Sequence, residues 1–278
     1  MLTDFHTHTT ASDGTMAPEE SLEYARKCGI THMAVTDHDS AGSLDRFMEK
    51  AKEFGITPVA GIEFGCPYKK GEVHILGYGM DWKNAKFHDA IEKLQKSRIG
   101  RIEKTLNILH DCGIELSMND LLQGSGGNPG RLHIARAAVK KGYFADEHEI
   151  FESLIGEGKK AYVKKETLSV HEASELVKQA GGITVVAHPG VTGLSRDDLE
   201  FMVSEGVGGI EVFYPEHLPD YRKTLELFAA DRGIIVTGGS DFHGVRNGKL
   251  TSIGMPDYPQ KHFRKFMEKI GVTEGESI

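Results

Sequence analysis

Short apolar runs that end in a polar residue recur along this chain. Five segments share this layout: residues 31–38, 58–63, 183–188, 207–213 and 234–241. Runs rich in valine and isoleucine are typical of strands that are buried on both faces, as in parallel sheets. The stretches between them have helical character and end at glycine; they cover residues 18–27, 44–54, 171–180 and 221–231. The pattern predicts alternating strands and helices.

This alternation over 278 residues favours an α/β fold of the (β/α) barrel type. Residues 81–163 depart from it, because helix-like sequence dominates there at residues 88–112 and 132–141, with a Gly/Ser/Asn/Pro-rich loop at residues 123–130. We interpret residues 81–163 as a helical insertion that covers the functional site. Residues 1–80 and 164–278 are then the catalytic barrel.

Composition and charge narrow the classes of function. The net charge of −8 offers no overall basic surface for duplex DNA. The three cysteines are far apart and form no CxxC pair, which disfavours a disulfide framework and a thiolate zinc site. No apolar run approaches the roughly 20 residues that cross a bilayer. We therefore expect a cytoplasmic protein without a membrane segment and without an obligate protein partner.

Histidine is unusually frequent, with 14 residues, and imidazole is the commonest metal ligand among side chains. His6 and His8 form an HxH pair, which projects to one side of a strand. Other histidines and carboxylates fall at or just past the ends of apolar runs: Asp13, His38, Glu63, His74, His188, Asp241 and His243. Barrel strands bring such positions to one rim. Nitrogen and oxygen ligands without sulfur favour manganese, iron(II) or zinc.

Five motifs resemble those of the PHP (polymerase and histidinol phosphatase) superfamily: HTHTTASDG at residues 6–14, VTDHD at 35–39, GIE at 61–63, VAHPG at 186–190 and GGSDFHG at 238–244. The resemblance implies a distorted (β/α)7 TIM-like barrel with two to three divalent metal ions. It assigns His6, His8, Glu63 and Asp241 to one ion, Glu63, His74 and His188 to a second, and Asp13, His38 and His243 to a third. The aspartate at position 13 resembles the residue that stand-alone phosphoesterases of the superfamily have at this place in the motif.

A further motif lies in the insertion. The segment GRLHIA at residues 130–135 is similar to a Gly-Arg-Pro-His motif of a subgroup that includes 3',5'-nucleotide bisphosphate phosphatases and 5'-to-3' exonucleases of the RNase AM type, with Leu132 in place of proline. A guanidinium can hold a phosphate by two parallel hydrogen bonds, so Arg131 is the candidate for a second phosphate. The substrate-binding candidates are Arg131, His133, His217 and Arg246.

These features predict a metal-dependent phosphoesterase. We expect hydrolysis of a small phosphorylated nucleotide, first the 3'-phosphate of nucleoside 3',5'-bisphosphates, by metal-activated hydroxide without a protein nucleophile. Manganese is the first expectation for the ions. The catalytic candidates are Glu63, Asp241 and His243, which act through the metals.

Four other functions stay open at this point. The same centre could trim short 5'-phosphorylated oligonucleotides in the 5'-to-3' direction. Histidinol phosphate is another candidate substrate, although Asp13 and Arg131 disfavour it. A non-catalytic metal-binding PHP module, as attached to polymerases, would work through protein contacts. An amide-cleaving metal enzyme is the last alternative, and Arg131 favours an anionic substrate over it.

Overall fold

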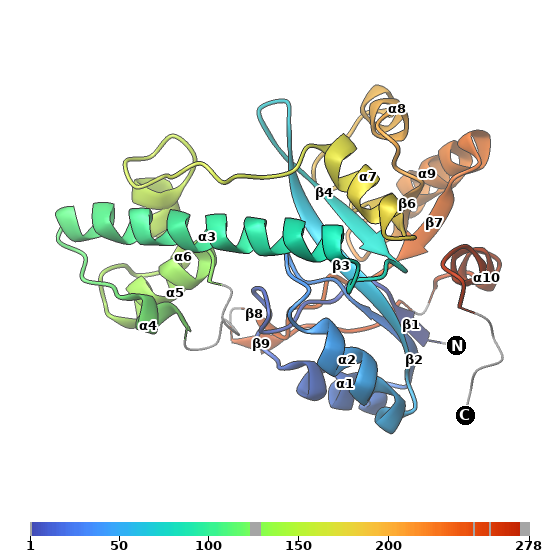
Figure 1. Cartoon of the computed structure of the whole chain (residues 1–278), viewed down its shortest axis with the longest axis horizontal. Coiled ribbons are helices and arrows are strands. Elements are labelled where there is room, and N and C mark those ends of the chain that lie inside the picture. The colour runs from blue at the N-terminus through green and yellow to red at the C-terminus, as the bar shows by residue number, and fades with distance from the viewer. Residues whose placement is uncertain (1, 123–128, 247, 256, 273–278) are drawn as a thin grey trace.

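The computed structural model describes residues 2–122, 129–246, 248–255 and 257–272. At its centre lies a seven-stranded sheet whose strands follow chain order (Figure 1). The strands are β1 (Leu2–Asp4), β2 (Ile30–Val35), β3 (Thr57–Tyr68), β4 (Gly71–Tyr78), β5 (Ile183–Val186), β6 (Gly209–Phe213) and β7 (Ile235–Gly238). Backbone hydrogen bonds run from Phe5 N to Gly238 O and from His8 N to Phe242 O. The two edges of the sheet therefore meet, and the predicted α/β fold class is confirmed.

One strand departs from the parallel arrangement. β4 pairs antiparallel with both of its neighbours, β3 and β5, whereas every other pair in the sheet is parallel. The reason is local: only Lys69 and Lys70 separate β3 from β4, and a connection this short can join strands only as a hairpin. The five apolar runs did not include residues 71–78, so the sequence pattern missed this strand as an element.

Helices cover the outside of the sheet. They are α1 (Pro18–Lys27), α2 (Leu44–Lys50) with a 3-10 turn (Ala51–Phe54), α7 (Val170–Gln179), α8 (Arg196–Ser204), α9 (Pro219–Arg232) and α10 (Gln260–Lys269). Figure 1 shows α1 and α2 on one side and α7, α8 and α9 on the other. Proline at the first helical position begins α1 and α9, and a Ser169–Glu172 capping box begins α7. These local signals agree with the predicted helices.

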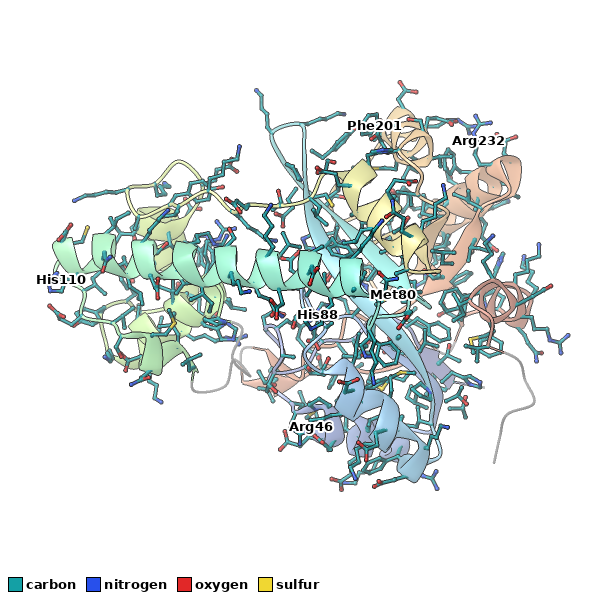
Figure 2. The ribbon with its side chains drawn as sticks, in the orientation of Figure 1. Arg46, Met80, His88, His110, Phe201 and Arg232 are labelled. Atoms are coloured by element: carbon teal, nitrogen blue, oxygen red, sulfur yellow. The ribbon has the colours of Figure 1, made fainter. Side chains whose placement is uncertain are left out.

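The insertion follows β4. It comprises α3 (Ala85–Asp111), α4 (Met118–Leu122), α5 (Arg131–Lys140), α6 (Glu147–Ile150) and a short π-helical segment (Phe151–Ile155). α3 extends from the sheet to the far end of the insertion, with His88 near its start and His110 near its end, both exposed (Figure 2). A hydrophobic cluster that includes Ile102, Leu109 and Ile134 forms a core apart from that of the barrel. The proposed boundaries at residues 81 and 163 stay a prediction.

Two further features complete the description. A small antiparallel hairpin, β8 (Val245–Arg246) and β9 (Lys249–Leu250), follows the end of β7. Among the described helices, none combines the length and the apolar character that crossing a bilayer requires.

Candidate metal centre and anion site

The predicted ligands converge at one rim of the barrel, formed by the carboxyl-terminal parts of the parallel strands and the amino-terminal half of the antiparallel β4. They lie within or just after six strands, and most are almost fully buried: His6, His8, Asp13, His38, Glu63, His74, His188, Asp241 and His243. Four overlapping groups of these side chains have ligand atoms within 4.8 Å of one another. The exposed fraction of the side chain is 0% for His6, His8 and Glu63. The chain thus gathers imidazoles and carboxylates from positions 6 to 243 into one pocket.

Glu63 on β3 lies at the centre of the group. Its Oε1 is 2.9 Å from His74 Nδ1 and 3.3 Å from His188 Nε2. Its Oε2 is 3.3 Å from His6 Nε2 and 3.1 Å from His8 Nε2. The two carboxylate oxygens therefore face two different sets of imidazoles. This is the geometry of a carboxylate able to bridge two ions.

A second carboxylate, Asp241, faces the same imidazoles from the end of β7. Its Oδ1 lies 3.2 Å from His8 Nε2 and 3.5 Å from His6 Nε2. On the other side of His8, Asp13 Oδ1 lies 3.1 Å from His243 Nε2, and Asp13 Oδ2 lies 4.0 Å from His38 Nε2. The structure places Asp13, His38 and His243 together, as the resemblance implied, and adds His8 to their group.

The donor set fits divalent metal ions. Among the described residues, several buried ligand atoms have no hydrogen-bond partner: His6 Nε2, His8 Nε2, Asp13 Oδ1, Glu63 Oε2, His74 Nδ1, His188 Nδ1 and His243 Nε2. Buried polar atoms without partners are costly, and native proteins satisfy them. Three carboxylates also place three negative charges in a buried space, which cations would neutralise. The clusters fit the multinuclear metal site of PHP phosphoesterases.

Buried carboxylates outside the ligand set hold its members in place. Glu211 on β6 accepts from His6 Nδ1 at 3.1 Å and from the His188 backbone N–H at 2.8 Å. Its partner, His6, therefore presents Nε2 to the cluster. Such outer partners fix the orientation and the tautomer of a metal-binding imidazole. The sequence analysis missed Glu211, although it lies in a run that had been assigned as a strand.

The same pattern recurs at the first two strands. Asp37 accepts from the Thr9 N–H at 2.8 Å and from Ser12 Oγ at 2.5 Å, which ties the loop after β1 to the loop after β2. Gly239, just after β7, lies very close to His6, because a Cβ at position 239 would be only 2.3 Å from His6 Cβ. His6 and the end of β7 can therefore meet only with glycine at that position.

Backbone strain is concentrated at the ends of the strands. Asp39, His188 and Asp241 have φ angles of 48°, 25° and 55° and follow β2, β5 and β7. Residues other than glycine rarely adopt positive φ, and proteins keep such strain mainly at functional sites. The positions of these three residues agree with a functional role for this rim.

The carboxylates dominate the electrostatics of the pocket. Burial alone would lower the pKa of His8, but the nearby carboxylates of Asp241 and Glu63 raise it to about 9. The pKa of His74 is raised to about 10, because Glu63 and Glu72 outweigh the effect of burial. Positive charge is thus favoured at these imidazoles, as expected of a site that attracts cations.

A different cluster lies beside the rim, made of Arg98, Arg101 and Arg131 of the insertion and of Lys165 just after it, with Asp39 and Glu72 as its carboxylates. Asp39 Oδ2 lies 3.1 Å from Arg98 Nη2 and 2.6 Å from Lys165 Nζ. Arg101 is 8% exposed, and its Nε has no hydrogen-bond partner among the described residues. Its pKa is lowered to about 10 by burial and by the charges of Arg98 and Arg131. The cations are therefore close enough to repel one another.

Of the predicted substrate-binding residues, Arg131 belongs to this cluster. It begins α5, and its guanidinium carbon lies 5.5 Å from the centre of the Tyr162 ring and 5.9 Å from that of Phe151. His133, on the next turn of the chain, is 5% exposed and accepts from the Gly130 N–H through Nδ1 at 3.0 Å. Its Nε2 has no partner among the described residues. Both residues keep polar atoms available for an anion.

His217 and Arg246 differ from these two. His217 Nδ1 contacts the Val212 carbonyl at 2.9 Å, and its Nε2 accepts from the Gly190 N–H at 3.1 Å. Both ring nitrogens are thus engaged by backbone groups, so His217 supports the loop after β5 instead of facing a substrate. The side chain of Arg246 lies outside the described residues. Arg98, Arg101 and Lys165, which the sequence analysis did not single out, lie in the cation cluster with Arg131.

Comparison with known proteins agrees with this architecture. The model of the PHP domain family matches residues 4–184. A 5'-3' exoribonuclease from Haemophilus influenzae is 29% identical, covering 86% of this chain and 89% of that protein. A 3',5'-nucleoside bisphosphate phosphatase from Chromobacterium violaceum is 29% identical, covering 88% of each. The crystal structure of a protein assigned as a metal-dependent phosphoesterase from Bifidobacterium adolescentis has a TM-score of 0.84 and 30% identity, covering 96% of each chain.

The matched family model spans more than half of the chain, so the chain belongs to the PHP domain family. The relatives and the metal-binding geometry define the class of enzyme: the chain is a hydrolase, a metal-dependent phosphoesterase of that family. The predictions of family, fold class and enzyme class are confirmed.

Proposed function

We propose that this enzyme hydrolyses a phosphate monoester of a small phosphorylated nucleotide, first the 3'-phosphate of nucleoside 3',5'-bisphosphates. The observation that carries this proposal is the cation cluster of the insertion. Four cations against the two carboxylates of Asp39 and Glu72 leave two positive charges next to the carboxylate-rich rim. A substrate with two phosphates matches such a pair of sites. The name of the Chromobacterium violaceum relative supports the same substrate class.

The reacting phosphate belongs at the barrel rim. We assign the nine converging side chains as metal ligands, with Glu63 as the bridge, and manganese as the first metal, iron(II) or zinc being alternatives. Bound divalent ions would polarise the phosphoryl group and lower the pKa of the attacking water. Glu63, Asp241 and His243 are the residues closest to that chemistry. Glu211 and Asp37 hold them in place through His6 and the loop after β1.

The second phosphate belongs at the insertion. His133 Nδ1 accepts from the Gly130 N–H, so the ring proton of a neutral His133 is on Nε2. Burial lowers the pKa of His133 to about 4, and the ring is therefore neutral near pH 7. Its buried Nε2–H has no acceptor among the described residues. A phosphate oxygen would supply that acceptor, while Arg131 and Arg101 contribute guanidinium donors.

A second candidate function is 5'-to-3' trimming of short 5'-phosphorylated oligonucleotides. The segment before α7 favours it: Lys159, Lys160 and Lys164 are exposed and lead along the chain to Lys165 in the cation cluster. Such a basic segment could contact further backbone phosphates. The Haemophilus influenzae relative carries the name of an enzyme with this activity. Both candidates use the same pocket for a terminal phosphate.

One turnover experiment separates the candidates. The purified enzyme is stripped with a chelator, reloaded with manganese and supplied with adenosine 3',5'-bisphosphate, a 5'-phosphorylated trinucleotide or p-nitrophenyl phosphate. We expect kcat/KM for the bisphosphate to exceed that for p-nitrophenyl phosphate, which lacks a second phosphate, by at least about 10-fold, since one charged hydrogen bond accounts for a factor of this size, and also to exceed that for the trinucleotide. Preference for the trinucleotide would select the second candidate. Full activity in the stripped enzyme would overturn both.

A further inference from the structure

Asp39 is a buried aspartate with no role in the candidate metal centre. It follows His38 directly but belongs to none of the groups of converging ligands. It is 3% exposed and has a φ of 48°, which aspartate adopts only at a cost. A buried carboxylate in a strained conformation calls for a compensating interaction. The partners of Asp39 show what that interaction is.

Both partners of the Asp39 carboxylate come from outside its own loop. Arg98 lies on α3, and Lys165 lies in the segment that leads from the insertion into α7. Both contact the same oxygen, Oδ2, at 3.1 and 2.6 Å. The neighbouring residue makes a further tie, because Ser40 Oγ accepts from Gln95 Nε2 at 3.2 Å. The loop after β2 thus holds both borders of the insertion.

The backbone of Asp39 is fixed to the metal centre. Its N–H donates to the carbonyl of Glu63 at 2.8 Å, and the Glu63 N–H donates to the Asp37 carbonyl at 3.2 Å. These backbone hydrogen bonds belong to an isolated parallel β-bridge that pairs His38 with Glu63. Asp39 therefore connects the backbone of His38 and Glu63, both candidate metal ligands, to the side chains of Arg98 and Lys165. The path from the metal centre to the two cations is short, because it runs through a single residue, Asp39.

We propose that Asp39 is a positioning residue that sets the spacing between the metal centre and the site for the second phosphate. This inference rests on the proposed function. Arg98 and Lys165 each use one N–H to contact Asp39 and keep their other N–H groups, so both side chains remain able to bind phosphate. The carboxylate also screens the repulsion between them. Asp39 thereby makes the enzyme selective for substrates whose two phosphates are separated as in a nucleoside bisphosphate.

Without the carboxylate, two effects oppose each other. The cluster gains one unit of net positive charge, which attracts phosphate more strongly. Lys165, however, loses the contact that orders its long side chain, and the side chain regains rotational freedom and moves away from Arg98. The side chains of Arg98 and Lys165 are only 10% and 16% exposed, so their mutual repulsion is weakly screened and drives them apart once the carboxylate is gone. We therefore expect weaker binding of the second phosphate.

The test compares Asp39→Asn with a matched control, Asp198→Asn. Asp198 is 6% exposed and pairs with Lys69 and Tyr68 far along the β3–β4 hairpin, so it is also a buried aspartate with a lysine partner. For each manganese-loaded protein, kcat and KM are measured with adenosine 3',5'-bisphosphate and with p-nitrophenyl phosphate. Binding of adenosine 5'-monophosphate to the metal-free proteins is measured by calorimetry. Metal content is determined in parallel.

For Asp39→Asn we expect the ratio of kcat/KM for the bisphosphate to that for the aryl phosphate to fall at least about 10-fold, mainly through KM. Adenosine 5'-monophosphate should bind correspondingly more weakly, with metal content unchanged. Asp198→Asn should leave the ratio unaltered. An equal loss on both substrates, a loss of metal, or tighter nucleotide binding would overturn the proposal. Failure of the wild-type enzyme to hydrolyse either ester would instead refute the proposed function.

A second variant covers the case in which Asp39→Asn does not fold. The side chain of Lys165 is 16% exposed, and Lys165→Met removes the same ion pair from the opposite side while keeping the length of the side chain. It should lower the substrate ratio by a similar factor. In a folded Asp39→Asn/Lys165→Met double variant, the two effects should not add, because they break one interaction. Additive effects, or a ratio that Lys165→Met leaves unaltered, would contradict the role of Asp39.

Discussion

The barrel rim and the insertion differ in the charged groups that surround their buried histidines. At the rim, Glu63 and Asp241 outweigh burial and raise the pKa of His8 to about 9. In the insertion, burial lowers the pKa of His133 to about 4, and the cations Arg136 and Arg98 add to that effect. His8 thus lies among carboxylates, whereas His133 lies beside guanidinium groups whose effect the nearby Asp13 carboxylate partly offsets. The proposed substrate, a phosphate ester with a second phosphate, would interact with both regions.

The two regions also differ in how they are supported. The rim is held by buried carboxylates from other strands, such as Glu211 and Asp37, and by glycine at position 239. The insertion offers charged side chains from helices, and its ties to the rim run through Asp39 and through Arg136, whose Nη1 lies 3.5 Å from the Asp13 carbonyl. We therefore expect the rim to carry the chemistry and the insertion to contribute selectivity.

The largest expected effect concerns the rim. Glu63→Gln removes the charge of the central carboxylate while keeping its shape. Loss of a residue that supports a metal ligand costs up to about 100-fold in activity, and loss of a ligand itself should cost more. Activity on both the bisphosphate and p-nitrophenyl phosphate should therefore fall by more than about 100-fold, and the content of bound manganese should fall with it. Turnover and elemental analysis check this outcome.

A matched control accompanies this variant. Glu200 pairs with Arg232 at the surface, and Glu200→Gln should change turnover by less than about twofold. A Glu63→Gln enzyme that retained its metal and its activity would remove the distinction between the rim and the insertion.

Sequence patterns predicted the rim far better than the insertion. Repeated strand ends and the HxH pair indicate the metal centre, because each strand of a barrel carries its own local signal to a common rim. The hydrophobic pattern also predicted α1 over residues 18–27, where proline begins and glycine ends the helix. Such signals need only a few neighbouring residues.

What the sequence did not predict depends on contacts between distant residues. Glu211 meets His6 across 205 positions, and in the sequence it is only a polar residue inside a strand. Arg98 and Arg101 have the spacing of an ordinary exposed helix face, and their pairing with the loop of Asp39 appears only in the fold. The antiparallel β4 depends on a two-residue turn without a clear turn motif. Long-range pairs leave no local pattern.

The next effect concerns the insertion. Arg131→Ala should reduce kcat/KM for adenosine 3',5'-bisphosphate by about 10-fold to 100-fold, the equivalent of one charged hydrogen-bond partner, and reduce that for p-nitrophenyl phosphate much less. Arg196→Ala is the matched control, since Arg196 also lies over an aromatic ring, that of Phe228, but outside the site. Steady-state kinetics on both substrates measure the contrast. Equal losses on the two substrates would argue against a phosphate site in the insertion.

The smallest expected effect is on the stability of the folded chain and concerns His133 in the insertion. The pKa of His133 is about 4 in the folded chain and about 6.5 in the unfolded one, so the unfolded chain takes up the proton first as the pH falls. His133 therefore contributes stability above pH 6.5 that is lost between pH 6.5 and pH 4. His133→Gln, which cannot take up this proton, should show a smaller fall in Tm from pH 7 to pH 5 than the wild type. Thermal melts of both proteins at the two pH values measure the difference, and identical falls would show that the insertion does not hold His133 in its neutral form.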